Sequence, residues 1–301
     1  MATVAPPVSL NAALREISAE MDRQFDALLP VPDDPRANLY RAMRHAAIGG
    51  GKRLRPLLVF ATARLFNVER IRAARASLAI ECIHVYSLIH DDLPAMDDDD
   101  MRRGKPTVHK AYDEATAILA GDCLHALAFE ILSHELTHPD PHVRIELIAD
   151  LAHASGPSGM AGGQAMDLEA EDTSFDLNTV TRLQAMKTGA LIACSVEAGA
   201  ILGRVTDAQR TSLRGYARDI GLAFQIADDL LDVEGDPDLA GKALGKDAAA
   251  GKETFVSLLG VDRARAQAAM LVDQAKAHLH GHGAEADLLR AIADYIVERD
   301  R

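Results

Sequence analysis

The chain contains 301 residues, of which 48% are hydrophobic and 26% are charged, a composition typical of a soluble globular protein with a sizeable core. Its net charge of −13 argues against a surface that binds nucleic acid. The N-terminus lacks a basic stretch followed by an apolar run, and no segment approaches the roughly 18 uninterrupted apolar residues of a spanning helix, so we expect a cytoplasmic protein without stable membrane insertion.

Helical spacing of apolar residues fills most of the chain and predicts an all-α fold. Ala- and Leu-rich segments follow this spacing, whereas sustained β-strand alternation is nearly absent. The short breaks between segments are typical of one domain, residues 1–301, rather than two. In chain order, helices are predicted over residues 11–29, 38–48, 56–66, 72–93, 113–136, 142–154, 160–168, 178–203, 208–233, 255–280 and 284–299. Three widely spaced cysteines without a C-x-x-C pair are expected to be reduced thiols: Cys82, Cys123 and Cys194.

A first acidic cluster directly follows the apolar run 80–89 and begins with Asp91 and Asp92. Six carboxylates lie within ten residues here, ending at Asp100. Pro94 has no amide proton, so the helix should end just before it, and Asp97 could join the first two carboxylates only through a turn. Helix C-termini already carry roughly half a unit of negative charge, so these acids need a cation.

A second acidic cluster follows the apolar helix that starts near residue 208. Asp228 and Asp232 are four residues apart and therefore share a helix face, with Asp229 beside them. One acidic run alone is usually a solvated surface. Two runs at matching helix ends instead favour a divalent metal site, because Mg²⁺ prefers carboxylate oxygens together with substrate phosphates.

The basic segment 49–56 has the opposite arrangement, since its cations lie at a helix N-terminus. Lys52, Arg53 and Arg55 follow Gly51 and lie at the positive pole of the helix predicted to begin at residue 56. Free backbone amides and cationic side chains together form a phosphate site. The acidic and basic segments together predict a site for a metal-bound diphosphate.

Further polar residues have two readings each. Arg102, Arg103 and Lys105 could hold a phosphate or merely neutralise the acidic run before them. Lys187 interrupts an apolar helix, where a lysine facing the core would need an anion or an acid as its partner. Gln225 has the same character, and a surface position is the alternative for both. The segment 234–252 is rich in Gly, Asp and Lys and is either a mobile lid or an ordinary surface loop.

These motifs, in this order, closely resemble the bacterial trans-prenyl diphosphate synthases, and their farnesyl diphosphate synthase branch in particular. The resemblance extends from the second helix to Arg299. It implies an isoprenoid synthase fold, which is a single bundle of about ten or more helices around a central cavity. It also implies that the protein is a homodimer. The matching motifs are Gly50-Gly51-Lys52-Arg53-Leu54-Arg55-Pro56, Asp91-Asp92-x4-Asp97 with Arg102-Arg103, Lys187-Thr188-Gly189 and Gln225-x-x-Asp228-Asp229-x-x-Asp232.

The resemblance also implies a role for each matching residue. A cluster of Mg²⁺ ions, three by analogy and replaceable by Mn²⁺, would be held by Asp91, Asp92, Asp97, Asp228, Asp229 and Asp232. Contacts to the allylic diphosphate would come from Arg102, Lys187, Gln225 and Lys242. The isopentenyl diphosphate site would comprise Lys52, Arg55, His84 and Arg103. Gly51 and Lys252 are expected to bind substrate as well. Thr188 and Gln225 would lie near the allylic cation, and the C-terminal Arg299 and Arg301 would help close the site.

The implied reaction is the condensation of isopentenyl diphosphate with dimethylallyl and then geranyl diphosphate. The allylic C–O bond ionises, the isopentenyl double bond attacks, and the departing pyrophosphate is a plausible proton acceptor because no side-chain base stands out. Bulk at Tyr86 and Ser87, five and four residues before Asp91, would limit the tail and favour fifteen carbons over twenty. A helical wheel is less favourable to Tyr86, because five residues at roughly 100° each turn it away from the Asp91 face.

Four alternatives remain open. A geranylgeranyl diphosphate synthase differs only in product length. A terpene cyclase would need no second diphosphate site, which the basic segment 49–56 argues against. A non-catalytic partner subunit would be expected to lose the acids or the basic segment, and a metal-buffering helical protein would not need phosphate-type cations.

Overall fold

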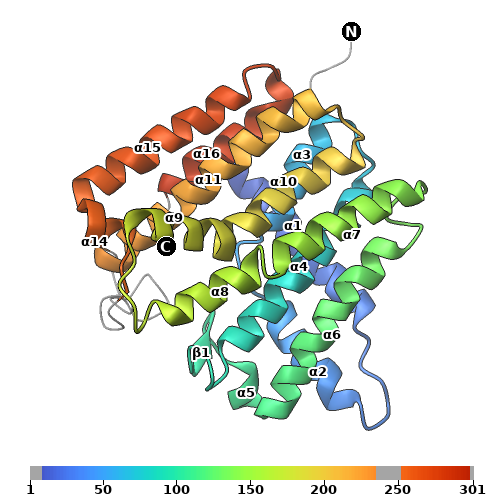
Figure 1. The fold of residues 1–301 in the computed structure, drawn as a ribbon. Helices are drawn as coiled ribbons and strands as arrows, with labels where there is room; N and C mark the ends of the chain where they lie inside the picture. Colours follow the sequence, from blue (N-terminus) through green and yellow to red (C-terminus); the bar gives the residue numbers. More distant parts are fainter. Residues whose placement is uncertain (1–8, 235–251, 299–301) are drawn as a thin grey trace.

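The protein is almost entirely helical, as the sequence predicts, and a computed structural model describes residues 9–234 and 252–298 (Figure 1). Within these two ranges the strands form one short antiparallel hairpin, β1 (Met101–Arg102) with β2 (Lys105–Pro106). The helices are α1 (Leu10–Leu28), α2 (Ala37–Ala47), α3 (Leu54–Leu65), α4 (Arg70–Asp91), α5 (Val108–Ala111), α6 (Glu114–Ser133), α7 (Pro141–Ser155), α8 (Met160–Glu169), α9 (Leu177–Gln184), η1 (Ala185–Gly189), α10 (Ala190–Leu202), α11 (Asp207–Glu234), α14 (Phe255–Leu259), α15 (Val261–His278), η2 (Ala284–Ala286) and α16 (Asp287–Glu298).

Three local features differ from the predicted helices. The predicted helix 178–203 contains a π-helical turn, η1, between α9 and α10. The predicted helix 255–280 divides at Gly260 into α14 and α15. The segment after the first acidic cluster, for which the sequence predicts no strand, forms the β1–β2 hairpin. All three cysteines are free, as expected.

Helix α1 shows how an amphipathic helix attaches to the core. Its buried residues are Ala13, Ile17, Met21 and Phe25. Their spacing of four places them on one face, and the Ser9 side chain caps the first turn. Each large apolar side chain buried in this way contributes roughly 1.5–3 kcal/mol. One apolar face therefore holds α1 against the bundle.

Helices α4 and α11 carry the two acidic clusters and lie at the centre of the packing. α4 packs against α3, α6 and α10, and more than half of its residues are buried. α11 packs against α10, α15 and α16, and its buried Tyr216 donates a hydrogen bond to the Leu289 carbonyl oxygen at 2.7 Å. Their buried apolar residues belong to one continuous core cluster. Each acidic cluster thus lies at the end of a firmly packed helix.

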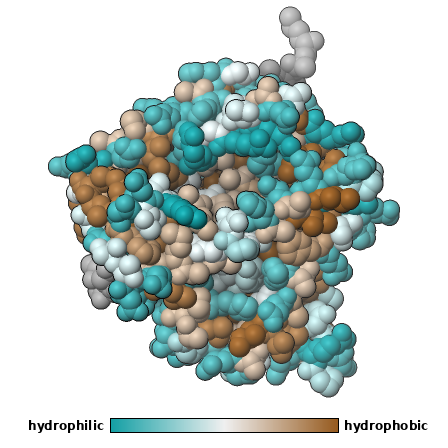
Figure 2. All heavy atoms as spheres, viewed as in Figure 1, coloured by the Kyte–Doolittle hydropathy of each residue, from teal (hydrophilic) through white to brown (hydrophobic). Residues whose placement is uncertain are grey.

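Two helical stretches of the described residues, Glu114–Ser133 and Leu177–Leu202, are long and apolar enough to cross a membrane by length and composition alone. The second is 61% buried inside the protein, as expected of a core helix. Helix α6 is only 39% buried. Ile118 and Leu119 are among its exposed side chains, and Figure 2 shows apolar side chains on the part of the surface where α6 lies.

Candidate active site

The first acidic cluster is folded back on itself by the turn that Pro94 imposes. α4 ends at Asp91, and the amide of Asp97 donates a hydrogen bond to the Asp91 carbonyl oxygen at 2.8 Å. The chain therefore returns to the helix end, as the sequence requires if the acids are to converge. Burial, together with the nearby charges of Asp97 and Asp92, raises the pKa of Asp91 to about 6, against the opposing effect of Lys187.

The β1–β2 hairpin brings the cations after this cluster back toward it. Arg102 Nε donates a hydrogen bond to Asp92 Oδ1 at 2.6 Å, which fits the local-neutralisation reading of Arg102. Lys105 Nζ donates to the Ile48 carbonyl oxygen at 3.1 Å, at the C-terminus of α2. Lys105 therefore joins the hairpin to the end of α2 beside Gly49, while Arg103 lies against Gly50 and Gly51.

The basic segment forms one wall of a cavity of about 280 Å³. Arg55 and His84 lie together in it, with Arg55 Nη1 3.3 Å from His84 Nε2. Burial, followed by the charges of Arg55, Arg103, Arg53 and Arg102, lowers the pKa of His84 well below its usual value. The imidazole is therefore neutral near pH 7. Among the residues that the structure describes, the buried Nε of Arg55 has no hydrogen-bond partner, as expected of a site that receives an anion.

Arg103 reaches this cavity because glycine leaves room for it. A Cβ on Gly51 would lie 2.6 Å from Arg103 Cζ, and Gly51 has a φ of +82°, which favours glycine. Lys52 Nζ lies 5.9 Å from the centre of the Tyr295 ring on α16. The cations that line this cavity are Lys52, Arg53, Arg55 and Arg103. Such an arrangement suits an anion.

Arg53 belongs to the same segment but serves the fold. Its side chain is fully buried and donates hydrogen bonds to Glu81 Oε1 at 2.6 Å, to Asp22 Oδ1 at 3.0 Å and to the Ala47 carbonyl oxygen. These partners lie on α4, α1 and α2. Arg53 therefore ties three helices together, which the sequence pattern alone could not distinguish from phosphate binding.

The π-helical turn η1 carries Lys187 and Thr188. Lys187 Nζ donates to Asp167 Oδ2 on α8 at 2.9 Å, and Lys252 Nζ donates to the same oxygen at 2.9 Å. The lysine in the apolar helix thus has an acid partner, one of the two that the sequence requires. π-Helical turns occur frequently at functional sites because they change the direction of a side chain within a continuous helix.

The second acidic cluster lies on the last turns of α11. Gln225 and Asp229 are buried, and Asp229 Oδ2 accepts a hydrogen bond from the Phe255 amide at the start of α14 at 2.8 Å. Asp228 lies near enough to Arg55 to affect its pKa, which burial lowers overall. Among the described residues no three acid, histidine or cysteine side chains are close enough together to hold a metal ion. The six aspartates therefore do not form a ready cage.

Three expected residues lie outside the described residues: Lys242, Arg299 and Arg301. Most of the predicted lid segment, 235–251, also lies there. Two residues that contact predicted site residues, Asp167 and Tyr295, carry no motif that would predict them from the sequence. The requirement of Lys187 for an acid was the signal that could have found Asp167, but the partner on another helix could not be chosen.

Two aspartate-tipped helices beside a basic cavity, within an all-α bundle, define the isoprenoid synthase fold. The chain belongs to the polyprenyl synthetase family, which matches residues 36–294.

Individual relatives resemble the protein over nearly its whole length. It is 45% identical to farnesyl diphosphate synthase of Escherichia coli (strain K12), with 98% of this chain and 99% of the relative covered. An FPP/GFPP synthase from Zymomonas mobilis, with a crystal structure in the apo state, is 60% identical, with a TM-score of 0.90 and coverage of 97% of this chain and 99% of that one. Helicobacter pylori geranyltransferase, crystallised with magnesium and isoprenyl diphosphate, is 32% identical, with a TM-score of 0.82 and coverage of 99% and 100%.

Proposed function

We propose that this protein is a farnesyl diphosphate synthase that condenses isopentenyl diphosphate with dimethylallyl and then geranyl diphosphate to give (2E,6E)-farnesyl diphosphate. The observation that carries the proposal is a basic cavity that lies between Arg55 of α3 and His84 of α4, the helix that ends in Asp91. His84 and Asp91 are about two helical turns apart on α4. One diphosphate could bind at the basic cavity while a metal at the acidic cluster holds the other. The farnesyl diphosphate synthases of E. coli and Geobacillus stearothermophilus, 45% and 39% identical to the chain, support this product.

The metal would be Mg²⁺, with three ions and substitution by Mn²⁺ as the proposed details. The residues that would hold it are Asp91, Asp92, Asp97, Asp228, Asp229 and Asp232. They fit the ion chemically, because hard carboxylate oxygens are the ligands it prefers, and crowding of Asp91 against its acidic neighbours leaves it in need of positive charge. When bound, Mg²⁺ supplies positive charge opposite the departing diphosphate.

The two diphosphates would occupy different walls of the site. For isopentenyl diphosphate the proposed contacts are those around the basic cavity: Gly51, Lys52, Arg55, His84 and Arg103. For the allylic diphosphate they are Arg102, Lys187, Gln225, Lys242 and Lys252. Fixed cations near the departing oxygens lower the barrier to ionisation because they need no rearrangement as charge develops. Two separate cation groups argue against a terpene cyclase, and their completeness argues against a non-catalytic subunit.

After ionisation the isopentenyl double bond attacks the allylic carbon, and one proton leaves. Thr188 and Gln225 would stabilise the cation through their oxygen dipoles. His84 is surrounded by guanidinium groups that oppose protonation, so it is a poor base here. We therefore assign the proton to the departing pyrophosphate. Replacement of His84, Tyr86 and Glu81 one at a time tests this assignment, and it is wrong if one variant still ionises the substrate but no longer completes elimination.

One assay separates this function from its alternatives. Purified protein is incubated with Mg²⁺, dimethylallyl diphosphate and isopentenyl diphosphate, and the products are resolved by length. Linear C10 and C15 diphosphates are expected, with no product in EDTA. A cyclic hydrocarbon would identify a cyclase, and the absence of turnover would identify a subunit or scaffold.

We predict no histidine inflection in the pH profile of kcat/KM for isopentenyl diphosphate. Because the pKa of His84 is lowered, its imidazole stays neutral throughout the range from pH 6 to 8. By the same linkage, His84 contributes stability above its ordinary pKa, and this contribution is lost as the pH falls through the lowered value. The profile of His84→Gln should superimpose on the wild-type profile after scaling. An inflection near pH 6.5 present only in the wild type would contradict this prediction.

Product length is predicted to depend on Tyr86. Its ring packs edge-on against His90 and His125, with centroid separations of 5.7 and 5.0 Å, and so lies between α4 and α6. Tyr86→Ala should open this seam and shift the main product from C15 to C20 or longer, as measured by chromatography of the dephosphorylated products. Tyr86→Phe keeps the ring and should keep the wild-type length. Unchanged lengths in Tyr86→Ala would remove Tyr86 as the floor of the tail site.

Longer products are the second candidate function. The observation that favours it is the 60% identity to the Zymomonas mobilis FPP/GFPP synthase, whose name refers to two products. Geranylgeranyl synthases are also among the relatives, as in Capsicum annuum at 40% identity. The same product analysis decides this question, since a wild-type main product longer than C15 would replace our assignment.

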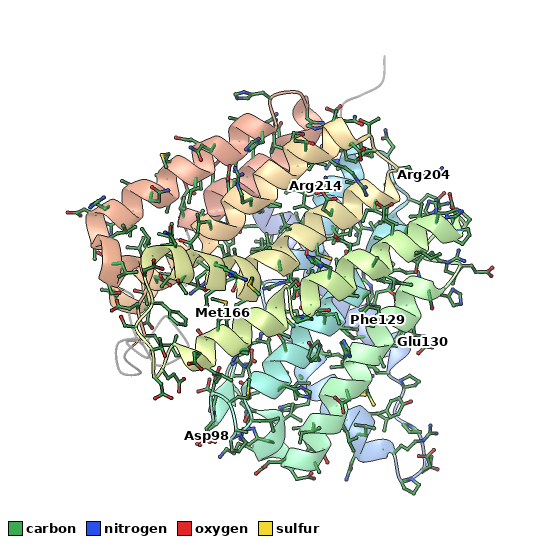
Figure 3. All side chains as sticks on the ribbon, viewed as in Figure 1. Asp98, Phe129, Glu130, Met166, Arg204 and Arg214 are labelled. Carbon is green, nitrogen blue, oxygen red and sulfur yellow. The ribbon has the colours of Figure 1, made fainter. Side chains whose placement is uncertain are left out.

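We propose that two copies of the chain associate through α6. Ile118 is 45% exposed and Leu119 53% exposed, and Phe129, labelled on α6 in Figure 3, is half-buried. Apolar surface of this kind is stabilised by a second copy of the chain. Leu119→Lys should convert a dimer to a monomer by light scattering, whereas Met270→Lys, an equally exposed apolar position on α15, should not. A monomeric wild type would exclude this interface, and binding to lipid vesicles instead would assign α6 to a membrane surface.

A single domain over residues 1–301 and a cytoplasmic location remain predictions.

A further inference from the structure

A single carboxylate oxygen on α8 accepts hydrogen bonds from two lysines that lie far apart in the sequence. Lys187 Nζ and Lys252 Nζ each lie 2.9 Å from Asp167 Oδ2. Lys252 also lies 3.1 Å from Glu171 Oε1, one turn further along the chain from Asp167. Only 14% of the Asp167 side chain is exposed, against 49% for Glu171. The shared contact is therefore largely desolvated.

Two ammonium groups meet the buried carboxylate of Asp167 and the half-exposed carboxylate of Glu171. Burial alone would raise the pKa of Asp167, yet the two lysines outweigh this effect and the pKa is lowered. Lys187 is also the cation with the largest effect on the pKa of Asp91, which it lowers against the effect of burial. Lys187 therefore acts on both Asp167 and the first acidic cluster, where the allylic diphosphate is proposed to bind.

The backbone beneath the contact is held closely. Gly163, one turn before Asp167 on α8, lies against η1, since a Cβ there would be 2.2 Å from the Lys187 amide nitrogen. Met166, labelled in Figure 3, marks this stretch of α8 beside the η1 segment. The carboxylate and the lysine backbone therefore have a fixed separation, as a positioning contact requires.

We propose that Asp167 is a positioning residue that holds Lys187 and Lys252 together, with both ammonium groups directed at the departing allylic diphosphate. This inference rests on the proposed function. Asp167 touches no reacting atom in this scheme and acts only through the lysines. Small displacements of such groups affect the chemical step far more than binding, because the transition state demands one geometry.

Asp167→Asn tests this proposal through a split between kcat and binding. The neutral side chain releases both lysines while it adds net positive charge, so kcat should fall about 30- to 100-fold. KM for isopentenyl diphosphate and the Kd of inorganic pyrophosphate with Mg²⁺, from calorimetry, should change less than threefold. Glu171→Gln is the matched control, because it contacts Lys252 but not Lys187, and its kcat should stay within threefold of wild type.

A double substitution separates positioning from simple packing. In a Lys252→Gln background, the loss caused by Asp167→Asn should shrink at least threefold, because one of the two lysines that it positions is gone. Undiminished loss, or a loss of pyrophosphate binding that parallels kcat, would overturn the positioning role. If Asp167→Asn does not fold, Asp167→Glu takes its place as the test. Its kcat should be lower than that of the wild type, because the longer side chain shifts the carboxylate. A full wild-type kcat would contradict the need for this geometry. If the wild-type protein neither binds pyrophosphate nor turns over substrate, the proposed function itself is wrong. If the wild type is active and Asp167→Asn is equally active, only the positioning role of Asp167 is wrong.

Discussion

Replacement of Asp91 by asparagine is expected to lower kcat by about 10³-fold, because it removes one charge from the proposed metal site without changing its shape. The carboxyl is mostly withdrawn from water, and its pKa of about 6 reflects burial and acidic neighbours. Because little water screens this position, a metal ion bound here would be stabilised much more by a charged carboxylate than by a neutral amide. The measurement is single-turnover condensation at saturating Mg²⁺ and substrates.

The control lies in the same acidic run. Asp98 has 62% of its side chain exposed and is 4.0 Å from Lys110, and Figure 3 shows it at the outer edge of the hairpin region. Asp98→Asn removes the same charge from the same stretch of chain, so kcat should change less than twofold. Equal effects of the two substitutions would mean that net charge, rather than a defined ligand, matters here. A loss below tenfold in Asp91→Asn would remove Asp91 from the metal site.

Replacement of Arg53 by methionine is expected to lower the free energy of unfolding by about 3–5 kcal/mol, because it leaves a buried acid without its partner. The Arg53 side chain is fully buried and that of Glu81 is 2% exposed, at 2.6 Å. Methionine fills much of the same volume, so the loss comes mainly from charge and from the hydrogen bonds to α1 and α2. Urea denaturation followed by circular dichroism measures it.

An exposed ion pair gives the comparison. Glu16 and Arg70 lie 2.7 Å apart, each with 55% of its side chain exposed. Glu16→Gln should change the free energy of unfolding by less than about 1 kcal/mol, because water screens such pairs. A loss in Arg53→Met as small as that in Glu16→Gln would mean that Arg53 is dispensable for the fold and would return it to the list of candidate phosphate contacts.

Much of the fold and part of the site follow from local patterns. The end of α4 could be predicted to within two residues, at 93 against the observed Asp91, because Pro94 cannot continue a helix. The spacing of Asp228 and Asp232 likewise predicted their common face on α11. The β1–β2 hairpin could not be predicted, because two-residue strands leave almost no alternation to detect. The helix break at Gly260 was missed since one glycine in a helical pattern is often tolerated.

The different uses of similar residues were beyond local reasoning. Arg53 and Arg55 are two positions apart, equally basic and both at the cavity, yet Arg53 ties α1, α2 and α4 together while Arg55 lies beside His84. Asp229 accepts a hydrogen bond from the start of α14, although the pattern places it with the metal ligands. Tyr295, 243 residues after Lys52, reaches it only because α16 packs beside the basic segment.

The sequence by itself determined an all-α protein with acids at two helix C-termini and cations at a helix N-terminus, because proline, glycine and helical periodicity act over a few neighbouring residues. Tertiary packing alone decided which buried charge faces which. Asp167 meets Lys187 and Lys252 only when α8, η1 and the start of the 252–259 segment are brought together. The physical reason is that Coulomb and hydrogen-bond energies depend on distances of a few ångströms across helices, which no spacing along the chain encodes.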